Sequence, residues 1–277
     1  MYVDNLCLTI TKNCNLKCEH CLRGDRFNIN ISDETIKNTF SKINKIGMLV
    51  LTGGEPLLSY NTIDLINKII KEIKLNNVKI DKILIFTNGT IYNEYIVKTL
   101  KELYALARSK SECILAISDD EYHGKEIERL KIVNKYIINT DKYNDLANEI
   151  GIKCGFKYID EVTNIGRAKN LNINKIKPDY EKSYFLKFLL ETLNFNYIEN
   201  YMEVLKIDCD GKSYMYELSN DMIDEYTLFN INEVNDIINT MKNYYLSKYG
   251  IISNLFTGSV SPNRKEIKQK RNYLNFK

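Results

Sequence analysis

The chain has 277 residues, of which 44% are hydrophobic and 27% charged, so it can bury the core of one large domain. Its net charge of +3 is too small to indicate nucleic acid as a partner, and the basic tail from Arg264 onward is typical of a solvated terminal helix. No apolar run reaches the ~20 residues of a membrane span. The first residues also lack the features of a secretion signal, so we expect a cytoplasmic protein with no membrane partner.

The first half of the chain alternates short apolar runs, typical of buried strands, with amphipathic helical patterns. The predicted strands are residues 6–10, 48–52, 83–87, 113–118 and 152–159. The predicted helices between them are residues 33–46, 62–74, 92–108 and 125–150, the last with a break near Thr140. This alternation predicts right-handed βαβ units and a parallel sheet covered on both faces. At ~30 residues per unit, about five or six units fit before residue 170, which predicts an α/β fold of the partial (β/α)6-type TIM barrel kind.

The pattern changes after about residue 170. Residues 204–209 and 212–216 flank Asp210-Gly211, which is a strong signal for a two-residue β-hairpin. Residues 232–248 then predict a capped amphipathic helix. We therefore predict a core domain over residues 1–170 and a small α+β appendage over residues 171–277, with the hairpin near 204–216.

The cysteines are unevenly distributed along the chain. Three of the seven lie in Cys14-Asn-Leu-Lys-Cys18-Glu-His-Cys21, and a cytoplasmic chain is not expected to use them in disulfides. This C-x3-C-x2-C segment follows the first predicted strand, at the end where parallel α/β proteins form their sites. Three close thiolates would hold three irons of a [4Fe–4S] cluster and leave the fourth iron open. A zinc site completed by His20 and a chance grouping of cysteines are the alternatives.

A second motif, Thr52-Gly53-Gly54-Glu55-Pro56, ends the second predicted strand. Two glycines let backbone approach a ligand closely, and Glu55 offers an acceptor for a cationic amino group. Each motif is weaker alone, but the pair, each after its own strand, is specific and favours iron–sulfur over zinc.

Together the two motifs resemble those of the radical S-adenosylmethionine (SAM) superfamily. Its members carry C-x3-C-x2-C, usually with an aromatic residue before the last cysteine, and Gly-Gly-Glu-Pro after the second strand. The resemblance implies that Cys14, Cys18 and Cys21 hold one [4Fe–4S] cluster and that SAM chelates the open iron.

The same resemblance implies how SAM is held. Gly53, Gly54 and Glu55 would hold its amino group within the motif that Pro56 closes. His20 occupies the position of the aromatic residue, and the backbone near it would contact the adenine.

At the fourth predicted strand the resemblance places a polar residue near the SAM ribose. Ser118 would take that role, and Asp119 and Asp120 are candidates beside it; a helix cap is the alternative for this cluster. His123 would face the substrate, or else lie in a solvated loop.

Two further residues are assigned in the same way. Asn88 would line the cavity, whereas turn formation with Gly89 explains it equally well. Gly166-Arg167-Ala168 resembles a Gly-Arg-Ala segment in many members, so Arg167 would pair with the SAM carboxylate. A surface salt bridge is the alternative for Arg167.

Beyond residue 170, the hairpin and the Phe229-Asn230-Ile231 segment resemble a reduced form of the C-terminal extension that carries auxiliary clusters in peptide-modifying members. Cys209 is the one cysteine in this region, and an auxiliary cluster needs several. We therefore predict no second cluster and a structural or lone reactive thiol at Cys209.

The resemblance implies reductive cleavage of SAM to methionine and a 5′-deoxyadenosyl radical that abstracts hydrogen from a substrate, with a flavodoxin or ferredoxin as electron donor. The reduced extension favours a peptide or protein side chain as substrate; a small metabolite, or the activation of a glycyl-radical enzyme, stays open. The appendage would then act as a lid and substrate selector. A zinc-binding protein and a non-catalytic interaction protein are the alternatives from another class.

Overall fold

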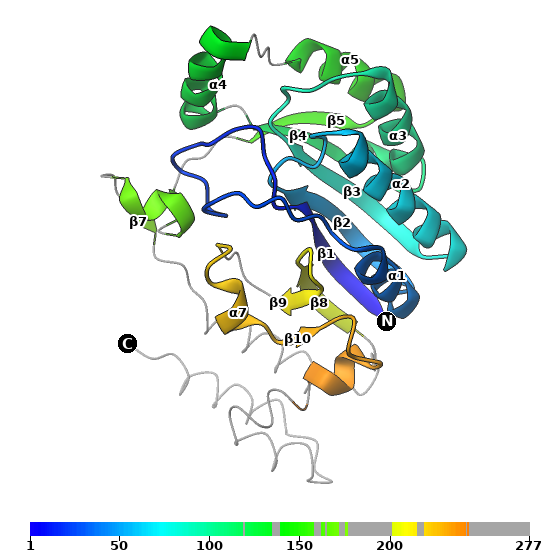
Figure 1. The fold of residues 1–277 in the computed structure, drawn as a ribbon. Coiled ribbons are helices and arrows are strands. Elements are labelled where there is room, and N and C mark those ends of the chain that lie inside the picture. Colours follow the sequence, from blue (N-terminus) through cyan, green and yellow to red (C-terminus); the bar gives the residue numbers. More distant parts are fainter. Residues whose placement is uncertain are drawn as a thin grey trace, which may run out of the picture.

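The structure is a computed structural model, and it describes residues 1–118, 120–134, 139–157, 162–163, 165–171, 175–176, 201–214, 219–241 and 243. Its main sheet has the strand order β10-β9-β8-β1-β2-β3-β4-β5 (Figure 1). These strands are β1 (Tyr2–Thr11), β2 (Lys45–Gly53), β3 (Lys79–Thr87), β4 (Ile114–Ser118), β5 (Lys153–Lys157), β8 (Tyr201–Ile207), β9 (Lys212–Tyr214) and β10 (Phe229–Asn230). Neighbouring strands from β8 to β5 run parallel, and β9 and β10 continue the sheet in antiparallel pairing. Two short strands, β6 (Val162–Thr163) and β7 (Lys175–Ile176), pair separately.

Helices cover the sheet because their apolar stripes match its apolar strands. They are α1 (Asp33–Lys42), α2 (Tyr60–Leu75), α3 (Glu94–Tyr104), α4 (Glu121–Asn134), α5 (Thr140–Ile150) and α7 (Ile223–Tyr226), with 3-10 turns η1 (Lys110–Glu112) and η2 (Gly166–Asn170). Figure 1 shows α1, α2, α3 and α5 in a row along one side of the sheet. Leu6, Leu49 and Ile85 of the strands are fully buried in one core with Ile66 of α2 and Leu100 of α3.

The predicted fold class is confirmed: the chain is an α/β protein with a mostly parallel sheet that stays open. The predicted hairpin forms as β8 and β9, but β8 pairs with β1, so this hairpin extends the core sheet. The division of the chain at residue 170 stays a prediction. The helix predicted over 232–248 is helical at 237–241 and at 243, and residues from 244 onward lie outside the described part.

One boundary error concerns the helix predicted over 33–46. It ends at Lys42, and Ile43 is already extended with φ −115° and ψ 126°. Lys45 and Ile46 pair with Tyr2 and Val3 of β1, so they belong to β2. The apolar residues up to Ile46 are spaced as on one face of a helix. Pairing with β1 outweighs that local signal.

The described residues include no helix that is long and apolar enough to cross a membrane. The cytoplasmic location therefore stays a prediction from the sequence.

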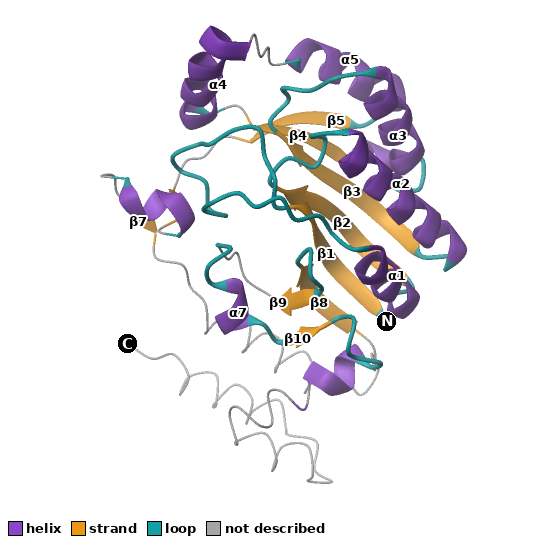
Figure 2. Cartoon of the chain, in the orientation of Figure 1, coloured by secondary structure: helices purple, strands orange, loops and turns teal. Residues whose placement is uncertain are grey.

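The long connection between β1 and α1 positions the cysteines. It leaves the carboxyl end of β1, runs to the side of α4 and returns to α1, and Figure 2 draws it in teal. Backbone hydrogen bonds fold it back on itself, from Lys12 N to Ile29 O at 2.8 Å and from Phe27 N to Lys12 O at 3.1 Å. We call residues 12–31 the cysteine loop.

Candidate functional site

The cysteine loop is joined directly to the end of β2. The backbone nitrogen of Gly54 donates to Thr11 O at 2.7 Å, and that of Glu55 donates to Asn13 O at 2.9 Å. The two motifs that the sequence analysis singled out are therefore neighbours in space, as the carboxyl ends of adjacent parallel strands require.

The two glycines of the second motif make this contact possible. A Cβ on Gly54 would lie 2.0 Å from Asn13 O, and a Cβ on Gly53 would lie 2.2 Å from Thr11 O. Gly53 also has φ +146°, where L side chains are strained. The sequence predicted a close approach to a ligand, but the close approach in the structure is to the chain's own cysteine loop.

The three cysteines of the loop are close enough for their charges to interact. Burial and, to a smaller extent, the nearby Glu55 and Cys21 together raise the pKa of Cys14 to about 12. Burial, and then the charges of Cys14 and Cys21, likewise raise the pKa of Cys18 above its usual value. Free thiols packed this way favour a bound cation that replaces their protons.

This crowding predicts how the stability of the iron-free protein depends on pH. A thiol whose pKa is raised on folding stabilises the folded state fully below the unfolded pKa of about 8.5. That contribution is lost as the pH rises toward the folded value of about 12 for Cys14. We expect the free energy of unfolding, from urea titrations at increasing pH, to fall less steeply above about pH 9 in Cys14→Ala. Parallel pH profiles would contradict the assignment.

Glu55 lies deep beneath the cysteine loop, 1% exposed. Its Oε1 accepts from Leu57 N at 3.0 Å and from Thr87 Oγ1 at 2.8 Å, and its Oε2 accepts from Asn88 N at 2.6 Å. Burial raises the pKa of Glu55, and these hydrogen bonds lower it in part. A carboxylate has about four acceptor positions, so Oε2 keeps one for a further donor.

Asn88 connects the end of β3 to the cysteine loop. Its Nδ2 donates to Asn15 Oδ1 at 2.9 Å and lies 3.8 Å from Cys14 Sγ. Its Oδ1 accepts from the backbone nitrogen and hydroxyl of Thr90. Asn88 therefore both forms the turn and approaches the cysteines, so the two predicted roles are compatible.

Arg167 lies on η2 and contacts the same loop. Its backbone nitrogen donates to Cys21 O at 3.0 Å and its Nε donates to Cys18 O at 2.9 Å. Its Nη1 is 3.8 Å from Asp25 Oδ1, which is too long for a hydrogen bond. This buried Nη1 has no hydrogen-bond partner among the residues that the structure describes.

The residues of α4 that support the loop carry no recognisable signal in the sequence. Glu126 accepts from Lys17 N at 2.9 Å and from Arg129 through both carboxylate oxygens. Ile127 packs with Leu16 and Cys18 in a small buried cluster. These contacts join segments about a hundred residues apart, so only the folded chain reveals them.

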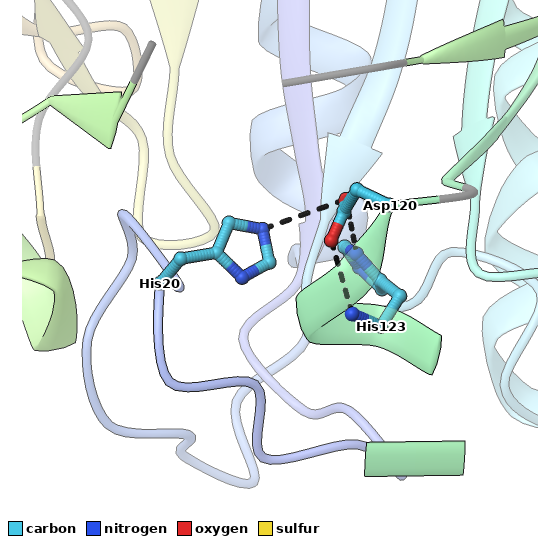
Figure 3. Close-up of side chains that lie close together, drawn as sticks. All are labelled: His20, Asp120 and His123. Atoms are coloured by element: carbon cyan, nitrogen blue, oxygen red, sulfur yellow. Dashed lines mark hydrogen bonds and ion pairs between the residues drawn. The ribbon is translucent and has the colours of Figure 1, made fainter. Parts of the chain in front are cut away.

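His20, Asp120 and His123 lie together between the cysteine loop and the start of α4 (Figure 3). Asp120 Oδ2 is 2.6 Å from His123 Nδ1 and 3.7 Å from His20 Nε2, and Tyr122 stacks on His20 with ring centroids 4.7 Å apart. Burial opposes ionisation of Asp120, but hydrogen bonds from the His123 side chain and backbone outweigh it and lower the pKa of Asp120.

Two predictions for this region are now resolved. His123 lies in α4, 16% exposed, so the solvated-loop interpretation is wrong. The predicted cap is correct for Asp120, whose Oδ1 accepts from Tyr122 N and His123 N at 3.0 Å each. Ser118 is the last residue of β4, and Asp119 lies outside the described residues.

Cys209 follows β8 and is 1% exposed. Its Sγ donates to Thr9 O at 3.2 Å, across the boundary between β8 and β1. Burial raises its pKa above the usual value. This environment suits the structural role, and the absence of a second cluster stays a prediction.

Residues 8–108 match the family model described as "Radical SAM superfamily". An uncharacterized protein of Methanocaldococcus jannaschii is 35% identical over 106 residues, which are 36% of this chain and 36% of that protein. The GTP 3',8-cyclase of Clostridium perfringens is 28% identical over 196 residues, which are 68% of this chain and 55% of the cyclase. The chain thus spans about half or less of these curated relatives.

Two solved structures share the fold. Native anSMEcpe with bound AdoMet has a TM-score of 0.51 and 17% identity over 88% of this chain and 80% of its own. The same protein with bound AdoMet and Cp18Cys peptide has a TM-score of 0.50 and 17% identity over 93% of this chain and 84% of its own. At this identity the likeness concerns the fold alone.

Proposed function

We propose, because residues 8–108 match the family model of the radical SAM superfamily, that this chain is an enzyme that cleaves SAM reductively and uses the resulting radical on a substrate. The cofactors of this superfamily are one [4Fe–4S] cluster and SAM. We propose Cys14, Cys18 and Cys21 as the cluster ligands.

One observation carries the proposal: the cysteine loop and the Gly-Gly-Glu-Pro segment form a single unit. The two backbone hydrogen bonds from Gly54 and Glu55 hold the segment on residues 11–13, and a Cβ on Gly54 would lie 3.1 Å from Cys14 Cβ. Thiols and a buried carboxylate that accepts hydrogen bonds therefore meet within one site.

The residues present fit both cofactors. Three thiols are ligands that iron–sulfur clusters use, and three of them leave one iron open. The amino acid end of SAM carries an ammonium and a carboxylate. The remaining acceptor position on Glu55 Oε2 and the buried Nη1 of Arg167 are complementary to these two charges.

Cys14, Cys18 and Cys21 would hold the cluster, which would supply the single electron for reductive cleavage of a C–S bond of SAM to methionine and a 5′-deoxyadenosyl radical. The residues of this chain would bind SAM, orient it, and shield it from water. Glu55 would hold the ammonium and Arg167 the carboxylate, and Gly53, Gly54 and Pro56 form the backbone that positions Glu55. Asn88 would line the cavity beside Cys14, the backbone near His20 would contact the adenine, and Ser118 would lie near the ribose. Packing of Leu16 and Cys18 of the cysteine loop against Ile127 of α4 limits access of water.

For the substrate, we propose a peptide or protein side chain, supported by the reduced C-terminal extension. A flavodoxin or ferredoxin is the proposed electron donor, and residues 171–277 are the proposed lid and substrate selector. A small molecule is the second candidate, because the GTP 3',8-cyclase of Clostridium perfringens aligns with 68% of this chain. Incubation with GTP separates the two: stimulated 5′-deoxyadenosine formation would favour the small molecule.

The test uses the full chain purified without air. We expect about four iron and four sulfide per chain and 5′-deoxyadenosine when dithionite and SAM are added. Zinc at the N-terminal thiols would instead support the interpretation of the chain as a structural zinc protein. An intact cluster without SAM cleavage would support the interpretation of the chain as a non-catalytic interaction protein.

A further inference from the structure

The chain has 2 histidines, and both imidazoles meet at one carboxylate. His20 comes from the cysteine loop, whereas Asp120 and His123 come from the start of α4 (Figure 3). The function proposed above uses the backbone near His20, so it leaves all three side chains without a role.

The geometry is close to that of a metal site. One potential ligand atom from each residue lies within 4.8 Å of the other two. Around a tetrahedral zinc ion with ligand distances of about 2.0–2.1 Å, neighbouring ligand atoms are about 3.3 Å apart. Asp120 Oδ2 is 2.6 Å from His123 Nδ1 and 3.7 Å from His20 Nε2, so small side-chain rotations would bring all three to that spacing.

The carboxylate is already fixed in place. Its Oδ1 is used by the backbone of Tyr122 and His123, which leaves Oδ2 directed at the two imidazoles. The stacked Tyr122 ring orients His20. Such supports keep the ligands ready for an ion. The helix dipole places about half a positive charge at the N-terminus of α4, which disfavours a cation there. The full negative charge of Asp120 is larger and favours one.

We propose that His20, Asp120 and His123 bind one divalent first-row cation such as zinc, at a site separate from the three cysteines. Two imidazoles and a carboxylate suit such ions, with a water molecule as the fourth ligand. The bound ion would connect the cysteine loop to α4.

The test is zinc binding by the cluster-loaded full chain, with the cysteines already occupied. After anaerobic equilibrium dialysis, we expect one bound zinc per chain above background. X-ray absorption at the zinc edge should show nitrogen and oxygen at about 2.0–2.1 Å, whereas zinc on thiols would show sulfur at about 2.3 Å. If the thiols also take zinc, the histidine site still adds one equivalent with nitrogen and oxygen ligands.

Three variants assign the site. His123→Ala and Asp120→Asn should each weaken this zinc binding at least about tenfold, and Asn keeps an oxygen for capping α4. Glu121→Gln is the matched control: it removes an exposed carboxylate in the same turn, paired with Lys125, and should leave affinity unchanged. Absence of zinc, sulfur as the only ligand, or equal affinity in His123→Ala and Asp120→Asn would overturn the proposal and leave a hydrogen-bonded cluster.

Discussion

Replacing Cys18 by alanine should reduce cluster content and SAM cleavage to background. The remaining pair of thiols leaves a [4Fe–4S] cluster one ligand short, and electron transfer to SAM requires the cluster. Cys18 is 5% exposed and packs against Leu16 and Ile127, so the smaller alanine side chain fits the same place. Iron and sulfide analysis and 5′-deoxyadenosine formation measure the effect, and circular dichroism checks the fold.

Cys113→Ala is the matched control. Cys113 is fully buried and its Sγ accepts from Ile83 N at 3.3 Å, away from the cysteine loop. We expect this variant to lose about 1–3 kcal/mol in the free energy of unfolding, because it leaves a buried donor unsatisfied. It should nevertheless keep its iron and cleave SAM. Iron retained in Cys18→Ala, or lost in folded Cys113→Ala, would refute the ligand assignment.

The sequence predicted the strand–helix alternation because apolar periodicity reports burial directly. The prediction failed where the structure of a segment depends on the strand with which it pairs. Residues 43–46 fit a helix by spacing, but the neighbouring β1 makes Lys45 and Ile46 part of β2. The hairpin was predicted from Asp210-Gly211, whereas its pairing with β1 depends on a contact between residues about two hundred positions apart.

The candidate site likewise contains residues that the sequence predicts and residues that only the fold reveals. Its cysteines and glycines form local motifs, so their spacing in the sequence was enough to predict them. Glu126 and Asp120 were missed or only partly understood, because their roles come from contacts with Lys17 and His20 on another segment. The contact of the glycines with the cysteine loop was missed for the same reason: Gly54 approaches the backbone of Asn13, on another segment.

Gly54→Ala should therefore destabilise the protein and reduce cluster assembly. The new Cβ would meet Asn13 O at 2.0 Å, and this neighbour is backbone, so relief requires movement of the whole cysteine loop. Overpacking of this kind costs about 1–3 kcal/mol, and we expect the upper end of that range. Urea unfolding of the iron-free protein measures the cost, and iron content after reconstitution measures the displacement of Cys14.

Gly124→Ala separates this clash from the general effect of replacing a glycine. Gly124 lies in α4 and a Cβ there would meet nothing within 4 Å. Alanine in a helix interior is favoured over glycine by about 0.5–1 kcal/mol, so this variant should gain stability and keep its iron. If Gly54→Ala instead kept full stability and iron but lost SAM affinity, the glycine would serve the ligand. The loop contact would then not be the reason for glycine at that position.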